Sequence, residues 1–352
     1  MALDDIKDTG YLNILRVFAS IAVIMIHVFS PINSSFSTAL TETESYYCVV
    51  LQNLWQWCVP LFVMISGVLF LNPHKEISVD KLLKRYFLRI VLVLFLFGIP
   101  YAFLELFFDA HYHFSVEQLG KALVNVVQGK LWDHMWYLYM IGGLYLVMPV
   151  FKIFAEHAGR ETIRYILIIL FIFTSLIPLV KTIFSCTFGM YLPISSVYAF
   201  YLLLGHYVHR YNITVKNTVL MSTVMLYLLY AILMPLIDTR FVNLKGGGAL
   251  SFLGYDSPLV VMITFGLFCL IRQNSKTNRL FDSLTPLCFG IYLIHTLFIN
   301  FLYKFVKFTP QHYPLVLVII GTMSITIVLS IAFSFCARKI GVIKNQCQQV
   351  KP

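Results

Sequence analysis

The segment LNILRVFASIAVIMIHVF, residues 12–29, carries two ionisable residues in an otherwise apolar stretch. Arg16 and His27 are eleven positions apart, almost three turns of an α-helix, so both side chains lie on one face. Asn13 and Ser20 extend that face as a polar stripe. A guanidinium group binds phosphate, and an imidazole, with an ordinary pKa of about 6.5, suits general-base chemistry near neutral pH.

Two interpretations of this stripe stay open from the residues alone. In the first, Arg16 reaches the inner headgroups and His27 hydrogen-bonds a neighbouring helix, so both are structural. In the second, they line a polar passage between helices, because a charge facing lipid near the bilayer centre costs at least about 2.5 kcal/mol. Their shared face favours the passage, along which a rise of about 1.5 Å per residue separates them by roughly 16 Å.

Membrane-spanning helices must position these residues. Of the 352 residues, 59% are hydrophobic and 12% are charged, whereas soluble domains have about a quarter charged residues. Apolar segments near the roughly 20 residues that cross a bilayer recur along the whole chain. The sequence therefore predicts an all-α, polytopic membrane bundle of about ten helices, at residues 11–30, 51–71, 86–107, 135–154, 163–181, 194–209, 217–237, 257–273, 285–304 and 314–337.

The distribution of lysine and arginine predicts the orientation of this bundle. A cytoplasmic N-terminus puts most of these residues on the inner side, so the positive-inside rule places both termini in the cytoplasm. The net charge is +10, but the basic residues are not concentrated in a soluble domain. This distribution argues against nucleic acid as a partner. We expect a cytoplasmic N-terminus at 1–10, one transmembrane domain at 11–337 and a short basic cytoplasmic tail at 338–352. The first span should stay as an anchor, because no cleavage site follows it.

Other polar patterns predict no metal centre. The seven cysteines are scattered without a CxxC pair, and we expect them to pack as small apolar residues. The pattern of His111 and His113 near Asp109 is too short to define a metal site. We therefore expect a solvated loop there. The segment KGGGALS lacks the context of a phosphate loop and predicts a mobile loop instead. The longest outer loops are expected at about 31–50, 108–134 and 238–256.

A basic cluster precedes the third predicted span, with Lys81, Lys84, Arg85 and Arg89 at helical spacing. Such a cluster binds anionic lipid headgroups or a phosphorylated cytosolic ligand. The residues alone leave both uses open.

Several motifs, in order along the chain, resemble the membrane acyltransferase-3 family. Arg16, ten intervening residues and His27 match its R-x10-H signature. VPLFVMISGVLFL resembles its FFxxSG segment through Ser66 and Gly67. Further along, the paired arginines of the basic cluster, HMWYLYMIGGLYLVMP and FGIYLIHTLF resemble later family motifs, although the proline usual after the second arginine is absent.

The resemblance implies an O-acyltransferase of a bacterial inner (plasma) membrane, multi-pass, using cytoplasmic acyl-CoA, most commonly acetyl-CoA. The chain resembles the stand-alone branch of the family, typified by the enterobacterial common antigen O-acetyltransferase. That branch implies a surface polysaccharide or its lipid-linked precursor as the acceptor. The lipid bilayer is the other partner, and the oligomeric state is not encoded in any readable pattern.

The resemblance also implies roles for individual residues. His27 would act as general base or carry the acyl group, with Arg16 on the donor side, and Arg85, Arg89 and Arg16 would bind the phosphates of acyl-CoA. Ser66 either stabilises an oxyanion or, as we favour, packs beside Gly67. The further candidates for shaping the site are Ser66, His134, Tyr137, His295 and Glu105.

Two rival functions use the same stripe differently. An exporter or flippase for lipid-linked sugars would use Arg16 and His27 as a transport path, and paired repeats or broken spans would support it. A glycan polymerase would need large outer loops with charged clusters. Neither signal is visible in the sequence.

Overall fold

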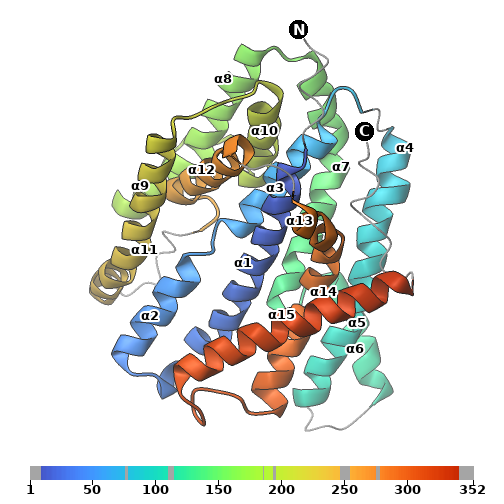
Figure 1. The fold of residues 1–352 in the computed structure, drawn as a ribbon, viewed down its shortest axis with the longest axis vertical. Coiled ribbons are helices and arrows are strands. Elements are labelled where there is room, and N and C mark those ends of the chain that lie inside the picture. The colour runs from blue at the N-terminus through green and yellow to red at the C-terminus, as the bar shows by residue number, and fades with distance from the viewer. Residues whose placement is uncertain are drawn as a thin grey trace. The chain divides into compact units, whose positions relative to one another are not determined.

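The computed structural model is a helical bundle (Figure 1) and describes residues 9–75, 78–109, 115–184, 186–192, 196–245, 254–274 and 278–340. Within them, 8 helical segments are long and apolar enough to cross a membrane: Tyr11–Ser34, Glu42–Phe70, Val79–Phe107, Asp133–His157, Arg160–Phe184, Asn217–Leu236, Arg279–Phe305 and Leu315–Lys339. The predicted polytopic all-α bundle is confirmed. The chain divides into two compact units, Phe70–Ala158 and the combination of Met1–Leu69 with Gly159–Pro352.

The second, sixth and eighth predicted spans contain α-helices that are too short to cross a bilayer alone. The sixth and eighth predicted spans correspond to α10 (Val197–Arg210, 14 residues) and α12 (Pro258–Asn274, 17 residues). The second is α3 (Cys58–Phe70, 13 residues), which crosses together with α2 (Glu42–Asn53) through a turn at 54–57. A crossing needs about 20 residues, so each short helix ends inside the apolar layer unless another element continues it.

The prediction of a loop at 31–50 is wrong for most of that region. It holds the end of α1 (Tyr11–Ser34), the turn η1 (Ser37–Ala39) and most of α2. α2 begins at a capping box, in which the Glu44 backbone N–H donates to the Thr41 hydroxyl and the Glu44 carboxylate accepts from the Thr41 N–H.

The other two predicted outer loops also contain helix. The region 108–134 includes α6 (Val116–Gln128), and α11 (Asn217–Lys245) runs into the region 238–256. His111, His113 and most of KGGGALS lie outside the described residues.

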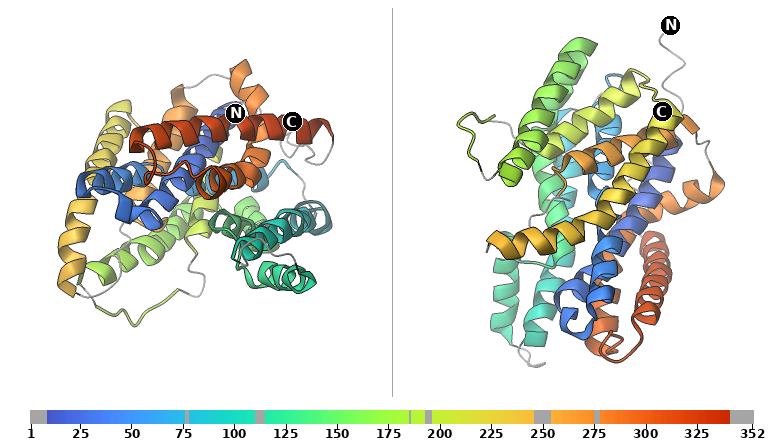
Figure 2. Two further views of the ribbon diagram at one scale, coloured as in Figure 1. Left: turned by 90° about the horizontal axis from the view of Figure 1, so that it is seen from below. Right: turned by 90° about the vertical axis from the view of Figure 1, so that its left-hand side faces the viewer.

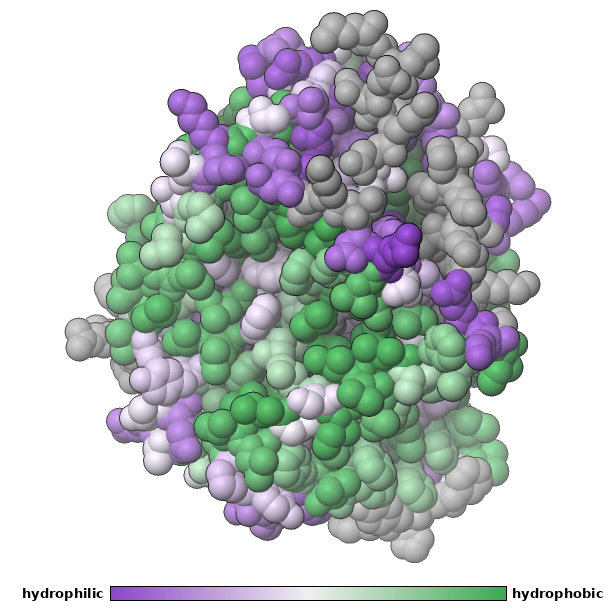
Figure 3. Space-filling view, in the orientation of Figure 1, coloured by the Kyte–Doolittle hydropathy of each residue, from purple (hydrophilic) through white to green (hydrophobic). Residues whose placement is uncertain are grey.

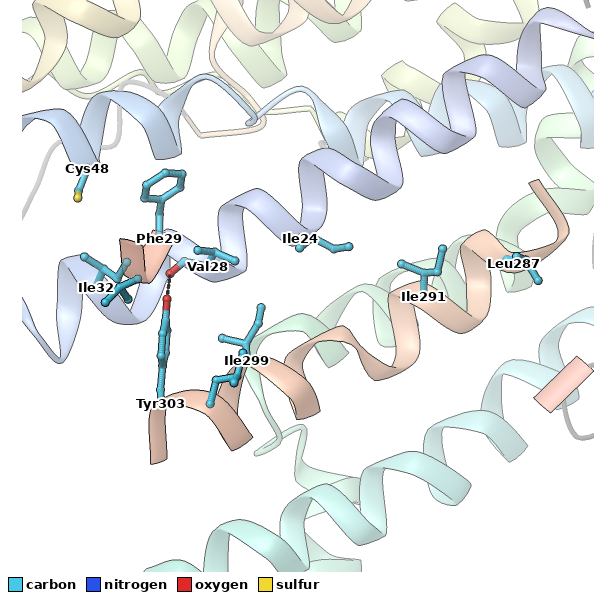
Figure 4. Packing of buried hydrophobic residues seen from close by; sticks show 11 residues of the cluster. Ile24, Val28, Phe29, Ile32, Cys48, Leu287, Ile291, Ile299 and Tyr303 are labelled. Carbon is cyan, nitrogen blue, oxygen red and sulfur yellow. Dashed lines mark hydrogen bonds between the residues drawn. The ribbon is translucent and has the colours of Figure 1, made fainter. Parts of the chain in front are cut away.

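The larger unit has its core between α1 and α14 (Cys288–Asn300), as Figure 4 shows. Ile24, Val28 and Ile32 of α1 pack with isoleucines of α14, and the Tyr303 hydroxyl donates to the Val28 carbonyl at 3.1 Å. This packing sets the two helices side by side. The remaining elements of this unit are α8 (Arg160–Phe171), η4 (Ile172–Leu176), α9 (Ile177–Phe184), α13 (Arg279–Leu284), η5 (Thr285–Leu287), η6 (Phe301–Phe305) and α15 (Leu315–Lys339).

α15 lies across α14 and touches α1 (Figure 2). The face that it turns to the protein carries small hydroxyl residues, including the fully buried Thr322, Thr326 and Ser330. Small side chains allow helices to approach closely in a membrane. On its other face Val316, Ile320 and other apolar residues are exposed, and apolar residues predominate in the middle of this side of the molecule (Figure 3). That surface suits contact with lipid.

Two glycines bring the backbones of α3 and α10 into contact. A β-carbon added to Gly67 would lie 1.9 Å from the carbonyl oxygen of Leu202. One added to Gly205 would lie 2.1 Å from the carbonyl oxygen of Met64. Each helix therefore supplies the glycine that the other backbone needs, which fits the packing role expected for Gly67.

The smaller unit consists of α4 (Val79–Lys81), η2 (Leu82–Phe87), α5 (Leu88–Asp109), α6, η3 (Asp133–Met135) and α7 (Trp136–His157). Buried Lys152 of α7 donates to the Asn72 carbonyl at 2.7 Å and pairs with Glu156 at 2.8 Å. A lysine is seldom buried unless it is paired. Lys152 thus holds Asn72, on the segment that leads to the basic cluster, against α7.

Candidate active site

Two histidines from distant parts of the chain meet inside the larger unit. The rings of His27 on α1 and His295 on α14 have centroids 5.1 Å apart and planes inclined by 56°. His27 is half-buried, and His295 is fully buried. The packing of α1 on α14 therefore joins the family signature residue to a second imidazole.

The backbone of α14 fixes the tautomer of His295. Its Nδ1 lies 2.7 Å from the carbonyl oxygen of Tyr292 and 3.2 Å from that of Ile291. A carbonyl oxygen accepts only, so we assign the ring proton to Nδ1. In the neutral ring Nε2 is then an acceptor, which can take a hydrogen bond from a donor such as a protonated imidazole nitrogen.

Arg16 lies on the same continuous helix as His27, at the spacing that the sequence predicts. It is half-buried, and its Nη1 donates to the Asn13 side-chain oxygen at 3.4 Å, a long hydrogen bond. Asn13 in turn donates to the Asp282 carboxylate at 2.7 Å. Ser20 donates to the Arg16 carbonyl at 2.9 Å, so its hydroxyl is satisfied within α1.

The paired arginines lie in the smaller unit, at a π-helical turn. The Leu88 N–H bonds the Leu83 carbonyl five residues back, which identifies η2 as π-helix. Arg85 in this turn is exposed, whereas Arg89 at the start of α5 is half-buried. Such turns are frequent at functional sites, and this one places two guanidinium groups at the head of α5.

His134 and Glu105 belong to one aromatic cluster of the smaller unit. The buried His134 ring lies 5.6 Å from the Tyr101 ring, which stacks on Trp132 at 4.4 Å with an interplanar angle of 14°. The Trp132 indole N–H donates to the Glu105 carboxylate at 2.8 Å. The structure therefore joins two candidates that the sequence left unconnected.

Ser66 and Tyr137 occupy less specific positions. The Ser66 hydroxyl donates to the Phe62 carbonyl of its own helix at 3.0 Å, beside the contact of α3 with α10. Tyr137 is half-buried, with its ring 6.3 Å from that of Trp136. Both geometries suit packing.

Within the described residues, no group of three or more histidines, cysteines, aspartates or glutamates is arranged to hold a metal ion. The cysteines in this part of the chain are free thiols.

Sequence reasoning missed Asp282 and the pairing of His27 with His295. Asp282 lies in α13, 269 residues after Asn13, so no local spacing links them. His295 was found through its motif, but its contact with His27 depends on the packing of α1 on α14.

The acyltransferase domain of the acyltransferase-3 family matches residues 9–335, which include Arg16, His27, both arginines of the pair and His295. The chain belongs to this family. No curated protein and no solved structure matches the chain. This acyltransferase-3 protein is thus a multi-pass membrane acyltransferase.

Proposed function

We propose that the protein transfers an acyl group, most commonly acetyl, from cytoplasmic acyl-CoA to a hydroxyl group of a surface polysaccharide or its lipid-linked precursor. The family assignment supports the acyl transfer, and the distribution of positive charge supports the cytoplasmic side for the donor. The contact between His27 and His295 is the observation that carries the chemistry. The branch resemblance supports the choice of acceptor.

His27 is the general base in this proposal. It takes the proton of the acceptor hydroxyl while the oxygen attacks the thioester carbonyl carbon, and the bond from carbon to sulfur breaks. The departing CoA thiolate then takes this proton from the imidazolium of His27. His295, with its proton on Nδ1, can accept a hydrogen bond at Nε2 from the imidazolium that His27 becomes.

Arg85 and Arg89 of the smaller unit bind the phosphates of acyl-CoA in this proposal, and Arg16 of the larger unit is a separate candidate for binding phosphate. Guanidinium groups stay charged and pair with phosphate in a bidentate way. Arg16 suits the task because its one described side-chain bond is long and no described carboxylate pairs with it.

Membranes that contain the protein, supplied with labelled acetyl-CoA, test the proposal. We expect label on extracytoplasmic glycan, and a drop of roughly 10²-fold or more in its rate for His27→Ala. A His27→Ala protein that folds normally and transfers at the wild-type rate would refute the assignment. Sugar translocation without labelling would favour an exporter or flippase instead.

The same assay tests the donor site. The double variant Arg85→Ala with Arg89→Ala should raise KM for the donor about tenfold or more, because two charged hydrogen bonds are lost. Arg164→Ala is the matched control, since Arg164 lies on the surface of α8 and pairs with Glu161. An unchanged donor KM would remove these residues from the donor site.

His27 can also carry the acyl group itself before transfer. A rapid quench with denaturant near neutral pH, after labelled acetyl-CoA is added without acceptor, distinguishes the routes, because an acyl-histidine hydrolyses quickly in acid. Label that stays on the protein, and is lost in His27→Ala, supports the covalent route, whereas unlabelled protein supports direct transfer.

A further inference from the structure

Tyrosines gather where the short helices α10 and α12 begin. Tyr198, in the first turn of α10, has its ring centroid 6.5 Å from that of Tyr255, which precedes α12. Both are half-buried, and the next residue, Asp256, is exposed. Two aromatic rings and a carboxylate therefore share one location.

The backbone of this turn is held in place from two helices. The Tyr201 hydroxyl of α10 donates to the Tyr255 carbonyl at 2.8 Å. The Ser175 hydroxyl of η4 donates to the Asp256 carbonyl at 2.5 Å. These bonds fix the main chain of Tyr255 and Asp256 and do not engage the Asp256 carboxylate. Within the described residues, no ion pair or hydrogen bond engages that carboxylate.

The cluster lies below the outer surface of the membrane if the cytoplasmic ends of α10 and α12 mark the inner surface. From Arg272, near that end of α12, to Pro258 the helix rises at most about 21 Å. The apolar layer is about 30 Å thick, and any tilt places Asp256 deeper. A carboxylate at such a depth is costly, and by default it marks a functional site.

The two tyrosine rings and the carboxylate indicate which class of ligand the cluster would bind. A carboxylate repels the phosphates of acyl-CoA, so the donor nucleotide is excluded. The negative face of a tyrosine ring attracts the C–H edges of a sugar ring, and a carboxylate accepts hydrogen bonds from sugar hydroxyls. Aromatic walls with a few polar groups are typical of a site that orients a small-molecule ligand.

We propose that Tyr198, Tyr255 and Asp256 form the saccharide subsite that binds the acceptor glycan. The subsite rests on the proposed function and names the residues that recognise its acceptor. It lies on the same unit as His27. Tyr198 and Tyr255 stack on a sugar ring, and Asp256 fixes its hydroxyl groups.

The test uses the full-length protein in detergent and the glycan of the source cells, freed of O-acyl groups by mild base. Asp256→Asn keeps the shape of the side chain and removes its charge, and Tyr198→Leu removes a ring. Each should raise the KM for glycan about tenfold and leave the KM for acetyl-CoA unchanged. Tyr198→Phe should restore the wild-type KM, because it keeps the ring.

Direct binding separates this inference from the proposed function. Titration calorimetry with the same glycan, without acetyl-CoA, should show an affinity about tenfold lower in Asp256→Asn than in the wild type. Tyr165→Leu is the control, since Tyr165 is exposed on α8 away from the cluster.

Each outcome decides one of the two proposals. Unchanged glycan KM and affinity in Asp256→Asn and Tyr198→Leu would overturn the subsite while acyl transfer stands. The opposite outcome is that the wild type binds the glycan but transfers no label, and that Asp256→Asn lowers the affinity for glycan. This outcome would refute the proposed function and support the subsite.

Discussion

At the scale of the residue, the site is a pair of imidazoles with different surroundings. His295 is fully buried and held through Nδ1 by two backbone carbonyls, whereas His27 is half-buried on the neighbouring helix. A fixed, buried ring suits orientation, and a ring with access to solvent or substrate suits proton transfer. This difference supports the proposed roles, with His27 as the base and His295 as the positioning residue.

His295→Ala should lower kcat by about tenfold to a hundredfold and leave the KM for acetyl-CoA unchanged, because an oriented base loses its partner. His295→Gln should recover part of kcat, since its amide oxygen can replace the Nε2 acceptor. Steady-state kinetics at equal amounts of folded protein measure both effects. If His295→Gln were as slow as His295→Ala with a normal melting temperature, the acceptor role would be wrong.

The sequence predicts local relations between residues better than distant ones. Arg16 and His27 share a face because the period of the helix fixes it over eleven residues. The bonds from Asn13 to Asp282 and from Trp132 to Glu105 join residues whose distance is set by packing and loops. No periodicity carries that information.

At the scale of the element, the contact of α3 with α10 has no room for a methyl group on either side. Gly67→Ala and Gly205→Ala should each lower the free energy of unfolding by about 2 kcal/mol or more, because backbone atoms rather than side chains must move. Thermal melting in detergent measures the loss. Gly143→Ala is the control, since a β-carbon there meets nothing within 4 Å. Equal melting temperatures for all three variants would contradict the close contact.

The errors in the predicted loops also have a cause at this scale. Low hydropathy predicted a loop at 31–50, although Thr41 and Glu44 carry the spacing of a capping box. α6 likewise begins with Ser115 and Gln118 in a capping box and ends at Gly129, whose φ of 73° is left-handed. Cap signals would have found both helices, whereas the π turn of η2 has no such signature.

At the scale of the whole molecule, the orientation of the bundle decides which face the proposed donor and the proposed acceptor would reach. Most lysines and arginines fall on the side of the predicted cytoplasmic termini. In the predicted orientation, the basic residues at the head of α5 face the cytoplasm, and the segment between α9 and α10 faces the opposite side. The donor and acceptor sides proposed above both depend on this assignment.

Native cysteines can report that orientation. Cys186, between α9 and α10, is exposed, whereas Cys48, Cys58 and Cys269 are buried. A membrane-impermeant maleimide should therefore label Cys186 in right-side-out vesicles, and Cys186→Ser should remove that label. The sequence places Cys347 in the cytoplasmic tail, so its labelling should need inside-out or permeabilised vesicles. Labelling of Cys186 from the cytoplasmic side would invert the bundle and exchange the two sides of the proposed reaction.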